Sequence, residues 1–237
     1  MKARIKFSKA GTMRFIGHLD LMRYFQKAFR RADIPITYSE GFSPHPVMSF
    51  ASPLGLGITS EGEYLDIQVN QEKTPEDMVA QMNTQMNEEI QVLSYTPLTD
   101  SAKTGMAVFD SASYLVCHRD GYPEIPAFVE NMQRFLAQDA IIVTKKTKRS
   151  EKEMDIRPYI FKAEYDFTEY DQGIVMGTPM VMLHLQAGSV TNIKPELVME
   201  AFCRFAGQEY NSYAWQIHRL DMFGPGEVPL SEYDRRA

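Results

Sequence analysis

Two histidines near the N-terminus stand in polar motifs and could serve as an acid and a base. His18 and Asp20 occur in the motif FIGHLD at residues 15–20, and His45 occurs in GFSPHP at residues 41–46. Imidazole exchanges protons near neutral pH, so these side chains are candidate catalytic groups for RNA cleavage or transfer. The structural alternative is that Asp20 complements the positive start of a helix while His18 satisfies a backbone group.

Four cations follow the first motif at helical spacing: Arg23, Lys27, Arg30 and Arg31. Steps of four and three residues place them on one helix face, and clustered cations of this kind bind phosphates. The first fifty residues carry nine Lys or Arg against three acids, whereas residues 51–100 carry one base against nine acids. The alternatives are therefore a solvated helix face, or pairing of these cations with the acidic segment.

The second motif predicts a stiff loop. Gly41 permits a tight turn, and Pro44 and Pro46 restrict the backbone on both sides of His45. Such a loop would present Phe42 and His45 in fixed positions for a partner. The alternative is a β-arch whose glycine and prolines only shape the chain.

A second basic cluster lies in the C-terminal half and consists of Lys145, Lys146, Lys148 and Arg149. Arg157 and Tyr159 follow it in the motif DIRPY at residues 155–159. Cations beside an aromatic ring suit single-stranded RNA, and in a catalytic interpretation Lys148 or Arg149 would stabilise negative charge. The alternative is the solvated tip of a hairpin.

Several other chemistries find no support in the sequence. There is no phosphate-binding loop, no dinucleotide fingerprint after a strand and no His-Glu-x-x-His, and the five histidines lack metal-ligand spacing. Cys117 and Cys203 lie in apolar patterns and are expected to be buried thiols. We therefore expect no metal and no cofactor in this chain, and an iron–sulfur cluster would need more cysteines.

The elements that position these residues follow from hydrophobic periodicity. Alternation predicts strands at residues 3–7 and 64–69, and an apolar stripe predicts a helix at residues 18–32 that Pro35 ends. Thr74 and the proline after it mark the start of a second helix.

The resulting order is strand, helix, strand, strand, helix, strand, the ferredoxin-like arrangement. Adjacent first and third strands would place Arg4 and Lys6 beside Tyr64 and Asp66 on the outer face, where cross-strand ion pairing is expected.

The same element order is expected again in the second half, which predicts an α+β protein of two tandem ferredoxin-like units with antiparallel sheets. We expect a first domain at 1–97, a linker at 98–110, a second domain at 111–223 and a flexible tail at 224–237. Without a long apolar run or signal-peptide pattern, no membrane association is expected and the location is expected to be cytoplasmic.

The three N-terminal motifs together, FIGHLD, GFSPHP and EGEYLD (residues 61–66), resemble the bacterial family of radical SAM-linked (radical SAM-associated) proteins, a domain of unknown function. Residues 145–146 and 155–158 are similar to its second half, and Gly17 stands where the family often has serine. The resemblance spans roughly residues 2–223. It implies a radical SAM partner protein that carries the iron–sulfur cluster, S-adenosylmethionine and cobalamin.

Three functions remain open at this point. The first is an accessory protein that binds RNA or delivers a substrate to a radical SAM modification enzyme, through a cleft of the cations named above. The second is a histidine-dependent RNA-processing enzyme. The third is a protein-interaction scaffold that binds no nucleic acid.

Overall fold

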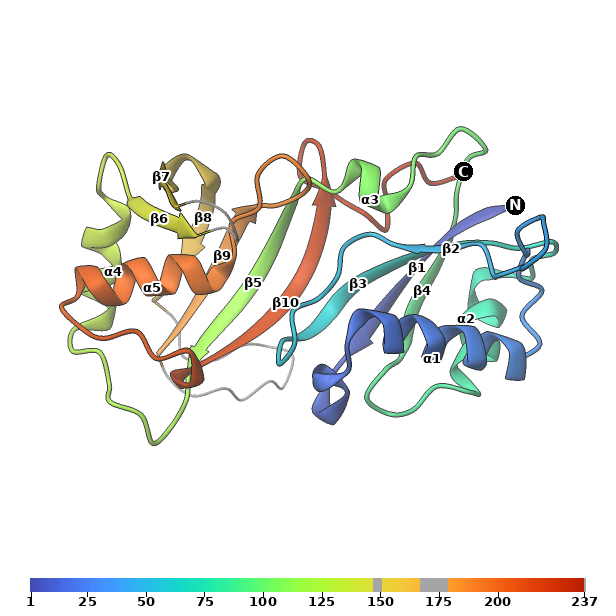
Figure 1. The fold of residues 1–237 in the computed structure, drawn as a ribbon, viewed down its shortest axis with the longest axis horizontal. Helices are drawn as coiled ribbons and strands as arrows, with labels where there is room; N and C mark the ends of the chain where they lie inside the picture. The colour runs from blue at the N-terminus through green and yellow to red at the C-terminus, as the bar shows by residue number, and fades with distance from the viewer. Residues whose placement is uncertain (147–150, 167–178, 237) are drawn as a thin grey trace. The chain divides into compact units, whose positions relative to one another are not determined.

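The computed structural model describes residues 1–146, 151–166 and 179–236, and it divides into two compact units (Figure 1). The first unit comprises residues 1–111 together with 219–237, and the second comprises residues 112–218. The fold is mixed α+β, with five α-helices in the described ranges and mostly antiparallel strand pairs.

The sheet of the first unit places β1 (Lys2–Lys9) between β4 (Val92–Pro97) and β3 (Thr59–Gln68), antiparallel to both. The short strand β2 (Met48–Phe50) pairs with residues 65–67 of β3. The strand β10 (Trp215–Gly224) is also bonded to β3, and β11 (Val228–Pro229) pairs with the end of β10.

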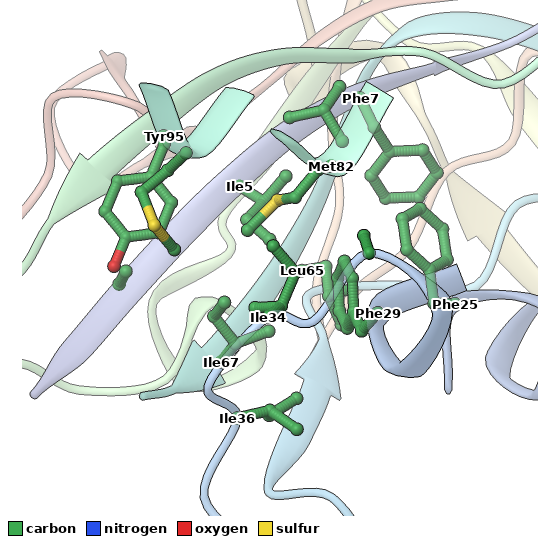
Figure 2. Close-up of a cluster of buried hydrophobic side chains, with 14 of the residues drawn as sticks. Ile5, Phe7, Phe25, Phe29, Ile34, Ile36, Leu65, Ile67, Met82 and Tyr95 are labelled. Carbon is green, nitrogen blue, oxygen red and sulfur yellow. The ribbon is translucent and has the colours of Figure 1, made fainter. Parts of the chain in front are cut away.

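Two helices, α1 (His18–Arg31) and α2 (Pro75–Asn83), cover one face of this sheet. Figure 2 shows Phe25 and Phe29 of α1 packed beside Ile5, Leu65 and Met82. The hydrophobic effect holds these elements together, because every one of these side chains is almost completely removed from water. The predicted start of α2 is confirmed, since the Thr74 side chain accepts a hydrogen bond from the Asp77 N–H at 3.2 Å.

The second unit has the strand order β10, β5 (Ser111–His118), β9 (Met180–Gln186), β8 (Ile160–Glu164). A separate antiparallel hairpin consists of β6 (Ile142–Lys146) and β7 (Glu151–Asp155).

The two longer helices of this unit, α4 (Phe128–Leu136) and α5 (Pro195–Phe205), contact each other through aromatic side chains. The centroid of the Phe202 ring lies 5.3 Å from the ring centroid of Phe128 and 5.6 Å from that of Phe135. The ferredoxin-like classification of each unit stays a prediction.

The C-terminal segment and the predicted linker are packed in the first unit. Leu230 is fully buried, and Arg4 donates hydrogen bonds to the carbonyls of Leu230 and Tyr233 at 3.1 and 3.3 Å. The linker region contains the short helix α3 (Gly105–Val108). The face of β1 that we expected to point outward is therefore covered, and Arg4 has no exposed surface.

No helix in the described ranges is both long and apolar enough to cross a membrane.

Candidate nucleic-acid interface

The EGEYLD motif on β3 holds the first unit together. Glu63 accepts two hydrogen bonds of 2.7 Å from Arg219 of β10, and both side chains are buried. The Tyr64 hydroxyl donates to Asp221 at 2.6 Å. Burial, assisted by Asp221, raises the pKa of Tyr64, so this phenol stays protonated and keeps donating.

The predicted pairing of β1 with β3 is confirmed for one of the two cations. Arg4 lies opposite Asp66 and bonds both of its carboxylate oxygens, at 2.7 and 3.1 Å. Lys6 lies opposite Tyr64 but pairs with Asp221 of β10 at 2.8 Å. The motif therefore has structural contacts with β1 and β10, which explains its polar character without catalysis.

A buried lysine positions the start of α1. Lys9, at the end of β1, is 1% exposed, and its Nζ donates to the Ile16 carbonyl at 2.9 Å. Burial lowers the pKa of Lys9 although Glu63 nearby favours its charged form. This bond fixes the turn before Gly17, the residue that precedes the first turn of α1.

His18 and Asp20 at that helix start have separate local contacts. The half-buried His18 ring lies edge-on to Phe50 at 5.1 Å, and the exposed Asp20 pairs with Arg23 at 3.2 Å. In the part of the chain that the structure describes, no hydrogen bond joins His18 to an acidic or basic side chain.

His45 lies in a loop that closes on itself. Its Nδ1 is 2.9 Å from the Ser39 hydroxyl, its backbone N–H donates to the same hydroxyl at 3.1 Å, and the Ser39 N–H donates to the His45 carbonyl. Phe42 is fully exposed at the turn of this loop. Across the described ranges His18 and His45 share no contact, so the geometry does not assemble an acid–base pair from them.

The cations of α1 form an exposed face. Arg23, Lys27, Arg30 and Arg31 are all exposed, while the opposite side of the helix buries Leu21, Phe25, Ala28 and Phe29. Within the described residues, the Arg23–Asp20 contact is the one ion pair made by these four side chains. The predicted pairing with the acidic segment is therefore not seen for Lys27, Arg30 and Arg31.

Exposed apolar side chains lie at the start of this face. Leu19 is 65% exposed and precedes Arg23 by one helical turn, and Phe15 is 63% exposed in the 3-10 helix at Gly11–Phe15. The Arg14 guanidinium lies 4.9 Å from the Phe15 ring, and the Arg14 carbonyl accepts the Gly57 N–H at 3.0 Å.

We call these six residues the α1 surface: Phe15, Leu19, Arg23, Lys27, Arg30 and Arg31. Sequence reasoning overlooked Phe15 and Leu19 as surface residues, although Leu19 stands at the spacing of the cation stripe.

The structure describes fewer of the cations predicted in the second half than of those on α1. Lys148 and Arg149 lie outside the described residues, as do the side chains of Lys145 and Lys146 at the end of β6. Arg157 donates to the carbonyls of Leu136 and Ile160, at 2.9 and 3.3 Å. These bonds tie its guanidinium to backbone of the second unit.

No group of three or more metal-ligating side chains occurs in the ranges that the structure covers. Cys117 and Cys203 are free and buried, as the sequence predicted.

One known family matches most of the chain, including the motifs described above. A family model described as an uncharacterized protein conserved in bacteria (DUF2344) matches residues 2–195, which include the whole α1 surface. A search of curated proteins finds no match. Because the family model covers most of the chain, the protein belongs to this bacterial DUF2344 family.

Proposed function

We propose that the protein binds single-stranded RNA through the α1 surface and works as an accessory to an RNA-modifying enzyme. The observation that carries this proposal is a helix face of four exposed cations, which make one ion pair among the described residues, together with exposed Phe15 in the 3-10 helix that precedes α1.

The cations supply the affinity in this proposal. Each phosphate that a Lys or Arg neutralises releases condensed counterions, and this release favours binding at low salt. Lys27, Arg30 and Arg31 are free to do this, because none of them is held by an ion pair in the described part of the chain. The chain as a whole is acidic, with a formal net charge of −6, so an RNA strand would be directed to this cationic face.

The exposed apolar residues favour a single strand over a duplex. An unpaired base can stack on an aromatic ring, and the bases of a duplex are already stacked on one another. Phe15 ends the 3-10 helix that precedes α1, and the guanidinium of Arg14 lies near its ring. A purely phosphate-binding surface would have no use for exposed Phe15 and Leu19.

The identity of the enzyme rests on the resemblance to radical SAM-linked proteins. In this proposal the partner carries the iron–sulfur cluster, S-adenosylmethionine and cobalamin, and the present chain presents the RNA. The predicted tandem ferredoxin-like units would be the scaffold for α1. A protein-interaction scaffold, with an acidic partner protein on the same face, is the outcome to expect if RNA does not bind.

The test is RNA binding measured by fluorescence anisotropy with a labelled single strand. The triple variant Lys27→Ala, Arg30→Ala, Arg31→Ala should bind at least about tenfold more weakly, since three phosphate contacts are removed. The matched control removes three exposed cations elsewhere, Lys73→Ala, Lys194→Ala and Arg204→Ala, and should bind like the wild type. Equal losses in both triple variants would reject the α1 surface as the site.

A second comparison tests the aromatic part of the proposal. Phe15→Ala should weaken binding of the single strand by about tenfold, since stacking of one base contributes about 1–3 kcal/mol. Phe42→Ala removes an even more exposed ring from outside the α1 surface and should have a smaller effect. Tighter binding of a duplex than of a single strand would contradict the role given to Phe15.

A further inference from the structure

A pocket of about 510 Å³ lies within the second unit, at the end where β5 finishes and β10 begins. Its walls come from His118 of β5, Cys203 of α5, and the segment 208–215 that leads into β10. The volume is in the range of about 300–1,000 Å³ that small-molecule sites occupy in proteins. The functional residues discussed above do not line this pocket.

Aromatic groups dominate the walls. The buried rings of His118 and Trp215 meet edge to face at 5.0 Å, and both residues are under 5% exposed. Tyr210 and Tyr213 also line the pocket, and Tyr213 is 74% exposed at its rim. A planar ring entering this space would find an inner aromatic wall already fixed by packing and an outer tyrosine free to close over it.

The segment that carries the tyrosines is held in place by local hydrogen bonds. Asn211 accepts the Tyr213 N–H at 2.9 Å with its side chain, and its carbonyl accepts the Ala214 N–H at 3.0 Å. The Gln208 N–H donates to the Cys203 carbonyl at 2.8 Å. Gln208 and Asn211 both line the pocket beside the aromatic residues, and the bond from Tyr213 fixes the side-chain oxygen of Asn211.

The inner groups of the pocket are uncharged near neutral pH. Burial lowers the pKa of His118, raises that of Tyr210, and raises the pKa of Cys203 to about 11. The lining residues include no Lys or Arg, and the exposed Glu209 is the one acid among them. Such a site offers nothing to neutralise a phosphate, so it favours a ligand without one.

From this geometry we infer that the pocket binds the heteroaromatic ring of an unphosphorylated nucleoside, with adenine as the preferred base. The rings of Trp215 and Tyr213 stack against the base. The amide of Gln208 supplies the paired donor and acceptor that match the edge of adenine. The pocket and the α1 surface belong to different units, so this inference stands independently of the RNA-binding proposal.

Trp215 makes the test direct, because it is the only tryptophan in the sequence and lines the pocket. Adenosine titrated into the full-length protein should quench or shift the tryptophan fluorescence in a saturable way. Guanosine, cytidine and uridine should change the tryptophan fluorescence only at higher concentrations than adenosine does. Adenosine monophosphate should bind more weakly than adenosine. A short oligoadenylate tests whether the pocket takes a base within RNA or a free nucleoside. Free adenosine should bind more tightly than the oligoadenylate.

Two variants check that the signal comes from this site. Tyr213→Ala should raise the dissociation constant for adenosine by about tenfold, as loss of one stacking partner predicts. Val190→Ala, a change at an exposed residue of the same unit outside the pocket, should leave it unchanged. The α1 triple variant should also bind adenosine normally.

Absence of a saturable response to every nucleoside would overturn the inference. So would an adenosine affinity that Tyr213→Ala does not change while the variant remains folded by circular dichroism. Tighter binding of the monophosphate than of adenosine would contradict the charge argument and assign the site to a phosphate-bearing ligand.

Discussion

Glu63 and Arg219 form the most completely buried ion pair among the described residues. Their side chains are 2% and 4% exposed, two hydrogen bonds of 2.7 Å join them, and the partly desolvated Lys9 lies close enough to interact with both. The attraction between two buried charges roughly offsets their desolvation, so the pair gives the fold little net stability. Removing one member is different, because it leaves the other charge buried and unpaired.

Glu63→Gln should therefore lower the free energy of unfolding by about 3–5 kcal/mol, since Arg219 and Lys9 would face no buried carboxylate. Denaturant titration followed by circular dichroism measures this change. Glu200→Gln is the matched control, because Glu200 pairs with Arg204 on the surface at 3.5 Å, and should cost less than about 1 kcal/mol. Similar losses in the two variants would show that the buried pair is no more critical than the exposed one.

His118 predicts a pH dependence with a definite sign. Burial holds the pKa of His118 below its ordinary value of 6.5, against the opposing charges of Glu124 and Asp120 and its hydrogen bond to the Pro123 carbonyl. The unfolded chain then takes up a proton at a higher pH than the folded chain, so stability falls as the pH drops below about 6.5. His118→Gln removes this contribution.

Between about pH 7.5 and pH 5.5, the variant should therefore lose less unfolding free energy than the wild type does. Denaturant titrations at the two pH values measure both differences. An identical acid dependence in the two proteins would mean that His118 takes up its proton equally in the folded and unfolded states.

At the level of elements, β3 and α1 organise the first unit. Polar residues of β3 bind β1 on one side and β10 on the other, while α1 buries one face and exposes its cations. The β3 register also requires a glycine. A Cβ atom on Gly62 would lie 2.4 Å from the Leu220 carbonyl oxygen and 2.4 Å from the Asp221 Cα, both backbone atoms of β10.

Gly62→Ala should push β3 and β10 apart and cost about 1–3 kcal/mol of unfolding free energy, as overpacking does. Gly17→Ala is the matched control, because a Cβ there meets nothing within 4 Å and the backbone is extended. It should change stability by less than about 1 kcal/mol in the same denaturation experiment. A harmless Gly62→Ala would contradict the close approach of the two strands.

Local signals predicted many of these elements. Pro35 predicted the end of the first helix, and Thr74 predicted the start of the second. Both predictions were possible because a proline and an N-cap side chain act on backbone only a few residues away. The expected adjacency of the first and third strands predicted that Arg4 would pair with the polar face of β3, where Asp66 lies opposite it. The residues that pair with Lys6 and Glu63 were not predictable in this way, since β10 lies more than 150 residues further along the chain.

The candidate site also has a part that could be predicted from local sequence and a part that depends on distant residues. The cation stripe of α1 follows from helical spacing alone, and the structure adds that three of its members are without ion pairs within the described ranges. The roles expected of EGEYLD and Arg157 could not be judged from sequence, because their partners are distant side chains or backbone carbonyls. The aromatic pocket of the second unit was missed entirely, since His118, Cys203 and Trp215 are separated in sequence.

For the whole molecule, the main consequence is that the first unit is completed by the C-terminus. Residues 1–111 belong to the first unit and are followed by the second unit. Residues 219–237 then belong to the first unit again. A tail rich in Gly and Pro was expected to be loose, but it buries Leu230 and supplies two carbonyls to Arg4. The last strand and tail are therefore part of the scaffold that holds α1.

Deleting residues 225–237 should destabilise the first unit by several kcal/mol, because Arg4 loses partners and the pocket around Leu230 is emptied. Thermal unfolding of the full chain and the truncated chain measures this. A shorter deletion of residues 235–237 keeps Leu230 and Tyr233 and should have a much smaller effect. Equal melting curves for the full chain and the longer deletion would show that the tail contributes no stability.

The central claim is that the cations of α1 neutralise phosphates of single-stranded RNA, and the salt dependence of binding tests it most directly. Four contacts predict a slope of about −3 for the logarithm of the association constant against the logarithm of salt concentration. The Lys27→Ala, Arg30→Ala, Arg31→Ala variant should reduce that slope to about −1. A slope near zero in the wild type, or an unchanged slope in the variant, would contradict the account.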